Sequence, residues 1–97
     1  MYTMIGIFKM DTAQYALQRK ELEERIVPMV KHQPGFVSAT WSYDREGGRS
    51  FSTVIFDSEA AARKMAAFVK EQNSNPNPAG VSMESITVCE LVAEARK

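Results

Sequence analysis

The sequence predicts an α+β fold of the ferredoxin-like type, with a four-stranded antiparallel sheet that carries two helices on one face. Three observations support this fold. Four segments show the period-two alternation of strands, two others have apolar residues at helical spacing, and the order of these segments is βαββαβ. Right-handed crossovers in a chain of this order place both helices on the same face of the sheet.

The first strand is predicted for residues 2–10, which are rich in β-branched and aromatic side chains. A long helix follows over residues 12–31, with Asp11 as its N-cap. Pro28 lies inside this helix and cannot donate a hydrogen bond to the carbonyl of Glu24, so we expect a kink or a broken last turn there. The apolar stripe of this helix consists of Tyr15, Leu22, Ile26, Met29 and Val30.

The middle of the chain predicts a hairpin. Pro34 and Gly35 end the helical region, and residues 36–44 and 49–57 form two antiparallel strands on either side of a turn at residues 47–48. Both turn residues are glycines, which tolerate the positive φ of tight turns. These two strands are therefore expected to be neighbours in the sheet.

The rest of the chain predicts a helix, a loop and a strand. The second helix begins at Asp57 or Ser58, either of which can cap it. Residues 73–80 are turn-forming and helix-breaking throughout, so they form a loop, and the last strand runs from about residue 81 to residue 93. The apolar stripe of the second helix consists of Ala61, Met65, Phe68, Val69 and Gln72.

The apolar residues of the sheet predict a partner subunit. The first and last strands carry large apolar side chains on both faces, the pattern of a sheet that is buried on both sides. Two helices about 10 Å apart cover a sheet roughly 19 Å wide on a single face only. Since soluble monomers rarely expose an apolar patch of more than about a few hundred Å², we predict a homodimer formed through the open face of the sheet.

An even number of residues in the hairpin loop assigns the two middle strands to faces. The bulkier set is expected beneath the helices and consists of Val37, Ala39, Trp41, Tyr43, Val54 and Phe56. The smaller set is expected to face the partner and consists of Phe36, Ser38, Thr40, Ser42, Phe51, Thr53 and Ile55. In the last strand, one parity carries Ile86, Val88 and Val92, and the other carries Met83, Cys89 and Leu91.

The composition excludes several classes of partner. Twelve basic and twelve acidic residues cancel, so the long-range field that attracts nucleic acid or an acidic membrane is missing. RNA-recognition domains share the order βαββαβ, but residues 49–53 supply only the first of their two stacking aromatics. No apolar run reaches the ~18 residues that span a bilayer, and the single cysteine, Cys89, suits a reducing cytoplasm.

Four side chains are candidate ligand-binding residues. Trp41 can form the wall of a pocket or belong to the core, and Tyr15 and Tyr43 can donate hydrogen bonds to a bound phenol or quinone or fill the edges of the core. His32 can act as a general base or ligand contact, or cap the C-terminus of the first helix. With one histidine in the chain we expect no histidine-rich metal site. No catalytic residue is assigned.

Two strings, KHQPGFVSATW (residues 31–41) and GGRSFSTVIFDSEAAARKMA (residues 47–66), carry a family resemblance. Placed on the βαββαβ pattern, they resemble the dimeric α/β-barrel superfamily, in particular the antibiotic biosynthesis monooxygenases. The most specific marks are Pro34-Gly35-Phe36, Trp41 and Phe56-Asp57-Ser58 before an alanine-rich helix. The resemblance spans nearly the whole chain and implies one domain over residues 1–97 with a pocket between sheet and helices.

The resemblance implies a cofactor-independent monooxygenase, an oxidoreductase that acts on a small aromatic or hydrophobic substrate. The alternative is a non-catalytic dimeric barrel with a ligand-binding, regulatory or stress-related role. The haem-degrading members of the family carry an Asn on the first strand, together with a Trp and a His further along the chain. The first strand here has no Asn, and His32 does not align with that ligand, so haem chemistry is disfavoured.

Overall fold

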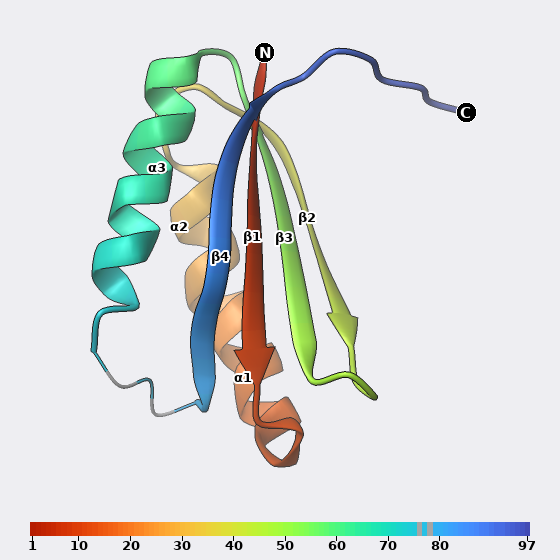
Figure 1. The fold of residues 1–97 in the computed structure, drawn as a ribbon, viewed down its shortest axis with the longest axis vertical. Coiled ribbons are helices and arrows are strands. Elements are labelled where there is room, and N and C mark those ends of the chain that lie inside the picture. The colour runs from red at the N-terminus through yellow and green to blue at the C-terminus, as the bar shows by residue number, and fades with distance from the viewer. Residues whose placement is uncertain (76, 78) are drawn as a thin grey trace.

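The computed structural model describes residues 1–75, 77 and 79–97 and confirms the ferredoxin-like fold (Figure 1). Its four strands form one antiparallel sheet in the order β2-β3-β1-β4. The strands are β1 (Tyr2–Met10), β2 (Phe36–Asp44), β3 (Arg49–Phe56) and β4 (Val81–Glu90). The helical elements are η1 (Thr12–Gln14), α1 (Tyr15–Glu21), η2 (Leu22–Ile26), α2 (Val27–Lys31) and α3 (Glu59–Gln72).

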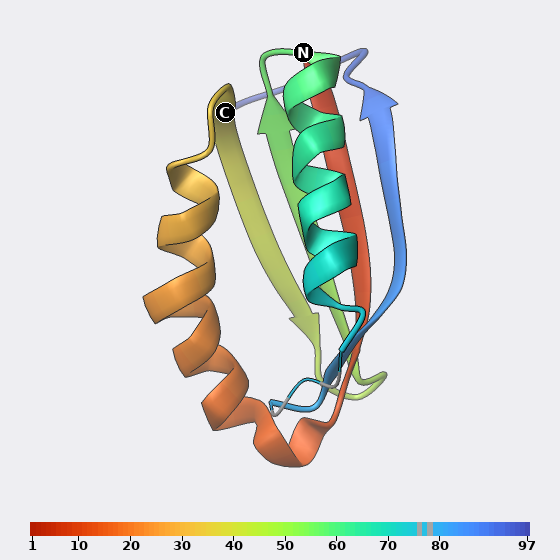
Figure 2. The same ribbon diagram turned by 90° about the vertical axis from the view of Figure 1, so that its left-hand side faces the viewer.

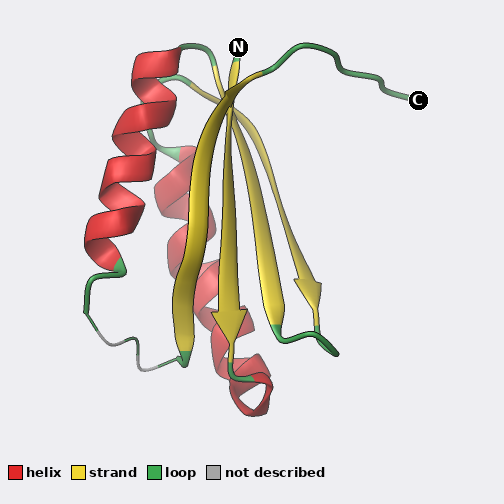
Figure 3. Cartoon of the chain, viewed as in Figure 1, coloured by secondary structure: helices red, strands yellow, loops and turns green. Residues whose placement is uncertain are grey.

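All helical elements lie on one face of the sheet and leave the other face bare, as predicted (Figure 3). Figure 2 shows two helical rods side by side across this face, with η1 to α2 as one rod and α3 as the other. The largest fully buried side chains, Phe56, Val54 and Met65, come from β3 and α3. The core is therefore the layer between these helices and the middle of the sheet.

The first helical rod is interrupted, but the interruption precedes the predicted position at Pro28. Its start is as expected, because the N–H of Ala13 donates to Asp11 Oδ1 over 3.0 Å. Leu22–Ile26 form a π-helical turn, in which the N–H of Val27 donates to the carbonyl of Leu22. Pro28 then lies in the first turn of α2, where its missing N–H costs least. The wider turn thus accommodates the proline without a broken end.

The π turn also aligns one side of this rod. Gln18, Leu22, Ile26 and Val30 are spaced by four residues and all face the sheet. An α-helix turns about 100° per residue, so a spacing of four drifts by about 40° at every step. A turn closed by i→i+5 bonds contains more residues and takes back part of that drift. The line from Gln18 to Val30 therefore stays over the sheet.

The β2–β3 hairpin has a four-residue loop. Its register shows that two residues, Phe36 and Val37, lie on the opposite faces of the sheet from those predicted. Trp41 lies opposite Ser52 and Tyr43 opposite Ser50, so both aromatic residues face the helices as predicted. A bulge at Val37 then reverses the alternation, because an extra residue in one strand shifts every side chain beyond it to the other face. Phe36 consequently packs against the core, whereas Val37 is 43% exposed.

The entry of the chain into β2 requires a glycine at position 35. Gly35 has a φ of 82°, and its carbonyl accepts a hydrogen bond of 2.9 Å from the N–H of Asp57. A Cβ atom at this position would lie 2.9 Å from the Cβ of Ala61. The predicted break at Pro34 and Gly35 is thus also the point where β2 is tied to the start of α3.

Strand β4 is shorter than predicted and also contains a bulge. It ends at Glu90 rather than near residue 93, although the N–H of Leu91 still donates to the carbonyl of Met1 over 2.9 Å. Beyond that bond the chain leaves the sheet and extends away from it (Figure 1). The bulge falls at Glu84, since Ile7 pairs with Ser85 but Phe8 pairs with Met83. Met83 therefore shares the helix-covered face, contrary to the predicted alternation.

Helix α3 is capped by Ser58, whose Oγ accepts the N–H of Ala61 over 3.2 Å. Its most buried residues are Ala62, Met65 and Ala66, and Phe68 of the predicted stripe is 37% exposed. The stripe is rotated because small alanines, rather than the aromatic ring, allow the helix to approach the sheet. Within the predicted loop over residues 73–80, residues 76 and 78 lie outside the described part of the chain. Among the described residues, no helix is long and apolar enough to cross a membrane.

Candidate functional site

A cavity of about 160 Å³ lies between the helices and the covered face of the sheet. Its floor is formed by side chains of β1, β2 and β3, and its walls by the π turn and α3. The floor and walls are mainly apolar, and polar side chains lie among them. An apolar cavity with a small number of polar groups is the usual form of a small-molecule site.

The cavity is lined by four methionines, Met4, Met10, Met29 and Met65. A cavity of roughly 150 Å³ holds one benzene ring, whereas most drug-sized ligands occupy about 300–1,000 Å³. Methionine side chains are unbranched and adapt their shape at low cost. The cavity thus has the volume of one aromatic ring, and the methionines are the lining side chains that adapt most easily to a larger ligand.

The opening of the cavity lies between the two helical rods. Its exposed lining residues are Arg25 of the π turn, Phe68 and Gln72 of α3, and Asn77 of the following loop. The two rods that carry the first three run side by side (Figure 2). Arg25 forms an ion pair of 2.7 Å with Glu21. Since both partners are about half exposed, this pair stabilises the fold by at most about 1 kcal/mol. The pair makes this side of the opening polar.

Of the four predicted ligand-binding residues, the structure places two in the cavity wall. Trp41 and Tyr43 lie on β2 with their side chains against the cavity. Tyr15 contacts Tyr43 edge to face, with ring centroids 5.6 Å apart, and is a neighbour of the wall rather than part of it. His32 is exposed at the C-cap of α2, outside the cavity, and its backbone N–H donates to the carbonyl of Pro28. His32 therefore lies at the C-terminal end of the helix and not in the cavity wall.

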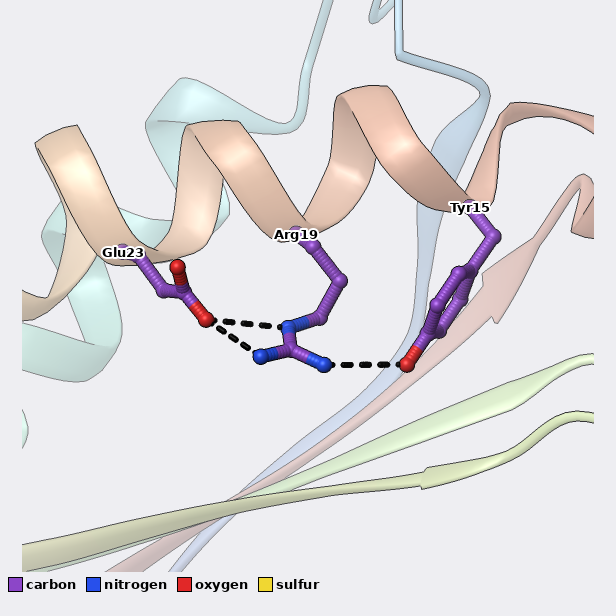
Figure 4. A network of polar contacts seen from close by, with 3 residues as sticks. All are labelled: Tyr15, Arg19 and Glu23. Carbon is purple, nitrogen blue, oxygen red and sulfur yellow. Dashed lines mark hydrogen bonds and ion pairs between the residues drawn. The ribbon is translucent and has the colours of Figure 1, made fainter.

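The ring of Tyr15 is held from two sides by cations. Arg19 Nη1 donates to Tyr15 Oη over 3.0 Å, and Arg19 Nε donates to Glu23 Oε1 over 3.1 Å (Figure 4). The guanidinium of Arg45 lies 4.0 Å from the centroid of the Tyr15 ring, within the range of a cation–π contact. These contacts join α1 to the loop of the β2–β3 hairpin and fix the ring that supports Tyr43.

Burial raises the pKa of Tyr43 above its ordinary value, and the nearby Arg19 only partly opposes this effect. The hydroxyl of Tyr43 is therefore neutral throughout the physiological range of pH. A neutral phenol can donate a hydrogen bond to a ligand oxygen, but it does not act as a general base near neutral pH. Tyr43 consequently suits a binding role.

The sequence analysis missed three polar residues of the cavity, Gln18, Ser50 and Ser52, all of which are buried. Gln18 is 3% exposed, and its Nε2 donates to the carbonyl of Asp11 over 2.8 Å and to that of Ala79 over 2.9 Å. Its position four residues before Leu22 was the available signal, because that spacing continues the buried stripe. Ser50 and Ser52 alternate with Val54 on β3, which likewise places them on the covered face.

No protein-family model matches the chain. Among curated proteins, the tetracenomycin-F1 monooxygenase of Streptomyces glaucescens is 28% identical over 91 residues, which cover 94% of this chain and 81% of that protein. The resemblance to antibiotic biosynthesis monooxygenases is confirmed. The chain is thus similar to a small monooxygenase of this type, and its cavity lies between sheet and helices as the resemblance implied.

Solved structures establish the same fold. The haem-degrading protein MhuD of Mycobacterium tuberculosis, with two haems bound in its active site, superposes with a TM-score of 0.74 at 18% identity, covering 99% of this chain and 100% of that one. The ActVA-Orf6 monooxygenase of Streptomyces coelicolor, in complex with nanaomycin D, gives a TM-score of 0.63 at 17% identity, covering 99% of this chain and 92% of that one. At these identities the similarity describes the fold of the chain.

Proposed function

We propose that the protein is a cofactor-independent monooxygenase that oxidises a small hydroxylated aromatic molecule in the cavity beside Trp41. The observation that carries this proposal is the cavity itself, which is apolar, has the volume of an aromatic ring and contains buried polar groups. The curated relative that matches most of the chain is named as a monooxygenase. A non-catalytic barrel, the alternative, would be expected to fill this space with its own side chains.

The proposed reaction converts a phenol to a para-quinone. One O₂ is consumed, the phenolic O–H and the para C–H bonds break, one oxygen atom forms the new carbonyl and the other leaves as water. The organic substrate supplies all the electrons, so the equation balances without a further reductant. In this scheme Trp41 forms the wall against which the ring lies, and the neutral hydroxyl of Tyr43 donates to a ligand oxygen.

The cavity offers no histidine to a haem. Its volume of about 160 Å³ is below the usual range of about 300–1,000 Å³ even for drug-sized ligands. His32, the one histidine of the chain, lies outside the cavity at the end of α2 and cannot contribute an axial ligand within it. We therefore assign no step to haem.

The test measures oxygen uptake with a hydroxylated aromatic, 1-naphthol, and follows one atom of ¹⁸O from ¹⁸O₂ into the naphthoquinone formed. The wild type is expected to consume one O₂ per quinone, and Trp41→Ala to lose at least about tenfold in rate, the effect of misplacing the ring by a fraction of its width. Lys64→Ala, on the exposed side of α3, is the control with unchanged rate. Uptake by the wild type no faster than by Trp41→Ala would argue for the non-catalytic alternative.

We also propose that residues 1–97 act as one domain and that two copies associate through the open face of the sheet, in a reducing compartment such as the cytoplasm. This face exposes the side chains of Phe51 and Ile5 by 39% and 36%. Its charged residues gather in the row next to the hairpin, where Arg49 and Glu84 form an ion pair of 3.1 Å. The remaining rows combine apolar residues with Ser and Thr, which suits close contact between two sheets.

Sedimentation velocity at micromolar concentration tests the dimer. The wild type is expected to sediment as two copies, and Phe51→Lys as one, because the substitution places a charge in the centre of the contact without a partner. Ala60→Lys adds the same charge on the exposed side of α3 and is expected to leave the dimer intact. A wild-type monomer at this concentration would contradict the proposed association.

A further inference from the structure

Gln18 presents an acceptor whose orientation is fixed by its own hydrogen bonds. The two atoms that approach its amide group are the carbonyl oxygens of Asp11 and Ala79, 2.8 and 2.9 Å from Nε2. Both are acceptors, so the amide nitrogen must face them and Oε1 must lie on the other side. Both amide hydrogens are used in these bonds, which leaves the oxygen as the one group that Gln18 offers to a ligand.

The oxygen of Gln18 is buried and has no donor among the described residues. Residues 76 and 78 are both prolines, and proline has neither a backbone N–H nor a side-chain donor. No residue outside the described part of the chain can therefore supply the missing hydrogen. Buried acceptors without a partner are rare, because their desolvation is not compensated, and this one belongs to a side chain that lines the cavity.

We infer that Gln18 Oε1 accepts a hydrogen bond from the hydroxyl group of the aromatic ligand, and that it thereby selects ligands that donate. A phenolic O–H is a good donor and is small enough to accompany one ring in this cavity. A carboxylate, an ether or a ketone would instead set its lone pairs against those of Oε1. Gln18 is thus a positioning residue, and it points the hydroxyl of the ring towards the end of the cavity where Asp11 and Ala79 hold the amide.

This inference rests on the proposed function and adds that the substrate is bound more tightly than the product. The phenol that enters the reaction carries an O–H, whereas the para-quinone that leaves it has only carbonyl oxygens. Gln18 therefore stabilises the bound substrate and not the product. The same acceptor that selects the substrate favours release of the quinone after oxidation.

The experiment compares two ligands of equal shape by isothermal titration calorimetry under nitrogen, where no turnover occurs. These are 1-naphthol, which has a donor, and 1-methylnaphthalene, which has none. The quantity of interest is the ratio of their dissociation constants in each protein. Because one hydrogen bond changes an affinity by about tenfold, we expect this ratio to shift by about tenfold against 1-naphthol in Gln18→Met. A loss of packing alone would weaken both ligands alike and leave the ratio unchanged.

Two further variants separate binding from folding. Gln18→Lys retains donors for the carbonyls of Asp11 and Ala79 but has no acceptor, so it is expected to show the same shift in the ratio while keeping the structural bonds. Gln33→Met is the matched control, since Gln33 Nε2 donates to the carbonyl of Met29 over 3.2 Å outside the cavity. Its ratio is expected to equal that of the wild type.

An unchanged ratio in folded Gln18→Met and Gln18→Lys would overturn the assignment of Gln18 Oε1 as an acceptor for the ligand. Failure of the wild type to bind either compound would overturn both the assignment and the proposed function. The expected ratios together with no oxygen uptake would support the role of Gln18 in binding and reject only the proposed reaction.

Discussion

The ring of Tyr15 meets the ring of Tyr43 edge to face, with centroids 5.6 Å apart and planes inclined by 75°. Tyr43 faces the cavity, whereas Tyr15 is held by Arg19 and Arg45 on the outer side of α1. The pair therefore connects the wall of the cavity to a cluster of cations on the surface. Edge-to-face pairs of this kind stabilise a fold by about 0.5–1.5 kcal/mol beyond the area that they bury.

The titration of Tyr43 predicts a loss of stability in alkali. Its pKa in the folded protein is raised by burial above the ordinary value of about 10. A group with a raised folded pKa contributes its full stability below the unfolded pKa and loses it as the pH rises through the folded pKa. Urea unfolding from about pH 9 to pH 11 is expected to show a smaller decrease in Tyr43→Phe than in the wild type. Parallel curves for the two proteins would contradict this origin of the effect.

The half-buried Trp41 contributes to stability as well as to the cavity wall. Truncation of a fully buried aromatic to alanine costs about 3–5 kcal/mol, so we expect Trp41→Ala to lose about 2 kcal/mol in the free energy of unfolding, measured with guanidinium chloride. Trp41→Phe is expected to recover more than half of that loss. Equal stability of Trp41→Ala and wild type would show that the indole packs against nothing but solvent.

The bulge at Val37 predicts that substitutions at two adjacent residues lower the free energy of unfolding by very different amounts. Phe36 packs against the core and Val37 is exposed, so Phe36→Ala is expected to destabilise the protein by about 2–3 kcal/mol. Val37→Ala is expected to cost only about 0.5 kcal/mol. Chemical unfolding of the two variants checks the order, and the reverse order would restore the regular alternation predicted from the sequence.

Substitutions at the adjacent residues Asp57 and Ser58 test which of them caps α3. Ser58 Oγ accepts the N–H of Ala61, and loss of such a cap typically costs about 1 kcal/mol. Ser58→Ala is therefore expected to lower the free energy of unfolding by that amount. Asp57→Ala should have the smaller effect, and a larger loss from Asp57→Ala would place the cap one residue earlier.

Most of the fold follows from local patterns in the sequence. The order of elements, the hairpin at residues 47–48 and the position of Trp41 and Tyr43 beneath the helices were all predicted, because each depends on periodicity over a few residues. The errors occur where one residue is added to a regular element. The bulges at Val37 and Glu84 and the π turn at residues 22–26 each change the phase of the side chains.

The cavity was less predictable than the fold. Trp41 and Tyr43 were predicted because the alternation of β2 places these aromatic side chains on the covered face of the sheet. His32 was chosen for its chemistry alone and lies at the end of α2, outside the cavity. Gln18 was missed because a glutamine on a helix resembles a solvated residue. Its burial depends on the carbonyl of Ala79, 61 residues away, and no local pattern encodes that contact.

The π turn has a consequence for comparing this chain with others. A helix with one wide turn contains an inserted residue relative to a regular α-helix of the same length. An alignment with a protein whose first helix is regular must therefore open a gap of one position within residues 22–26. Without that gap, Gln18 would be matched to a residue about 100° around the helix, and a side chain of the cavity would be equated with one on the surface.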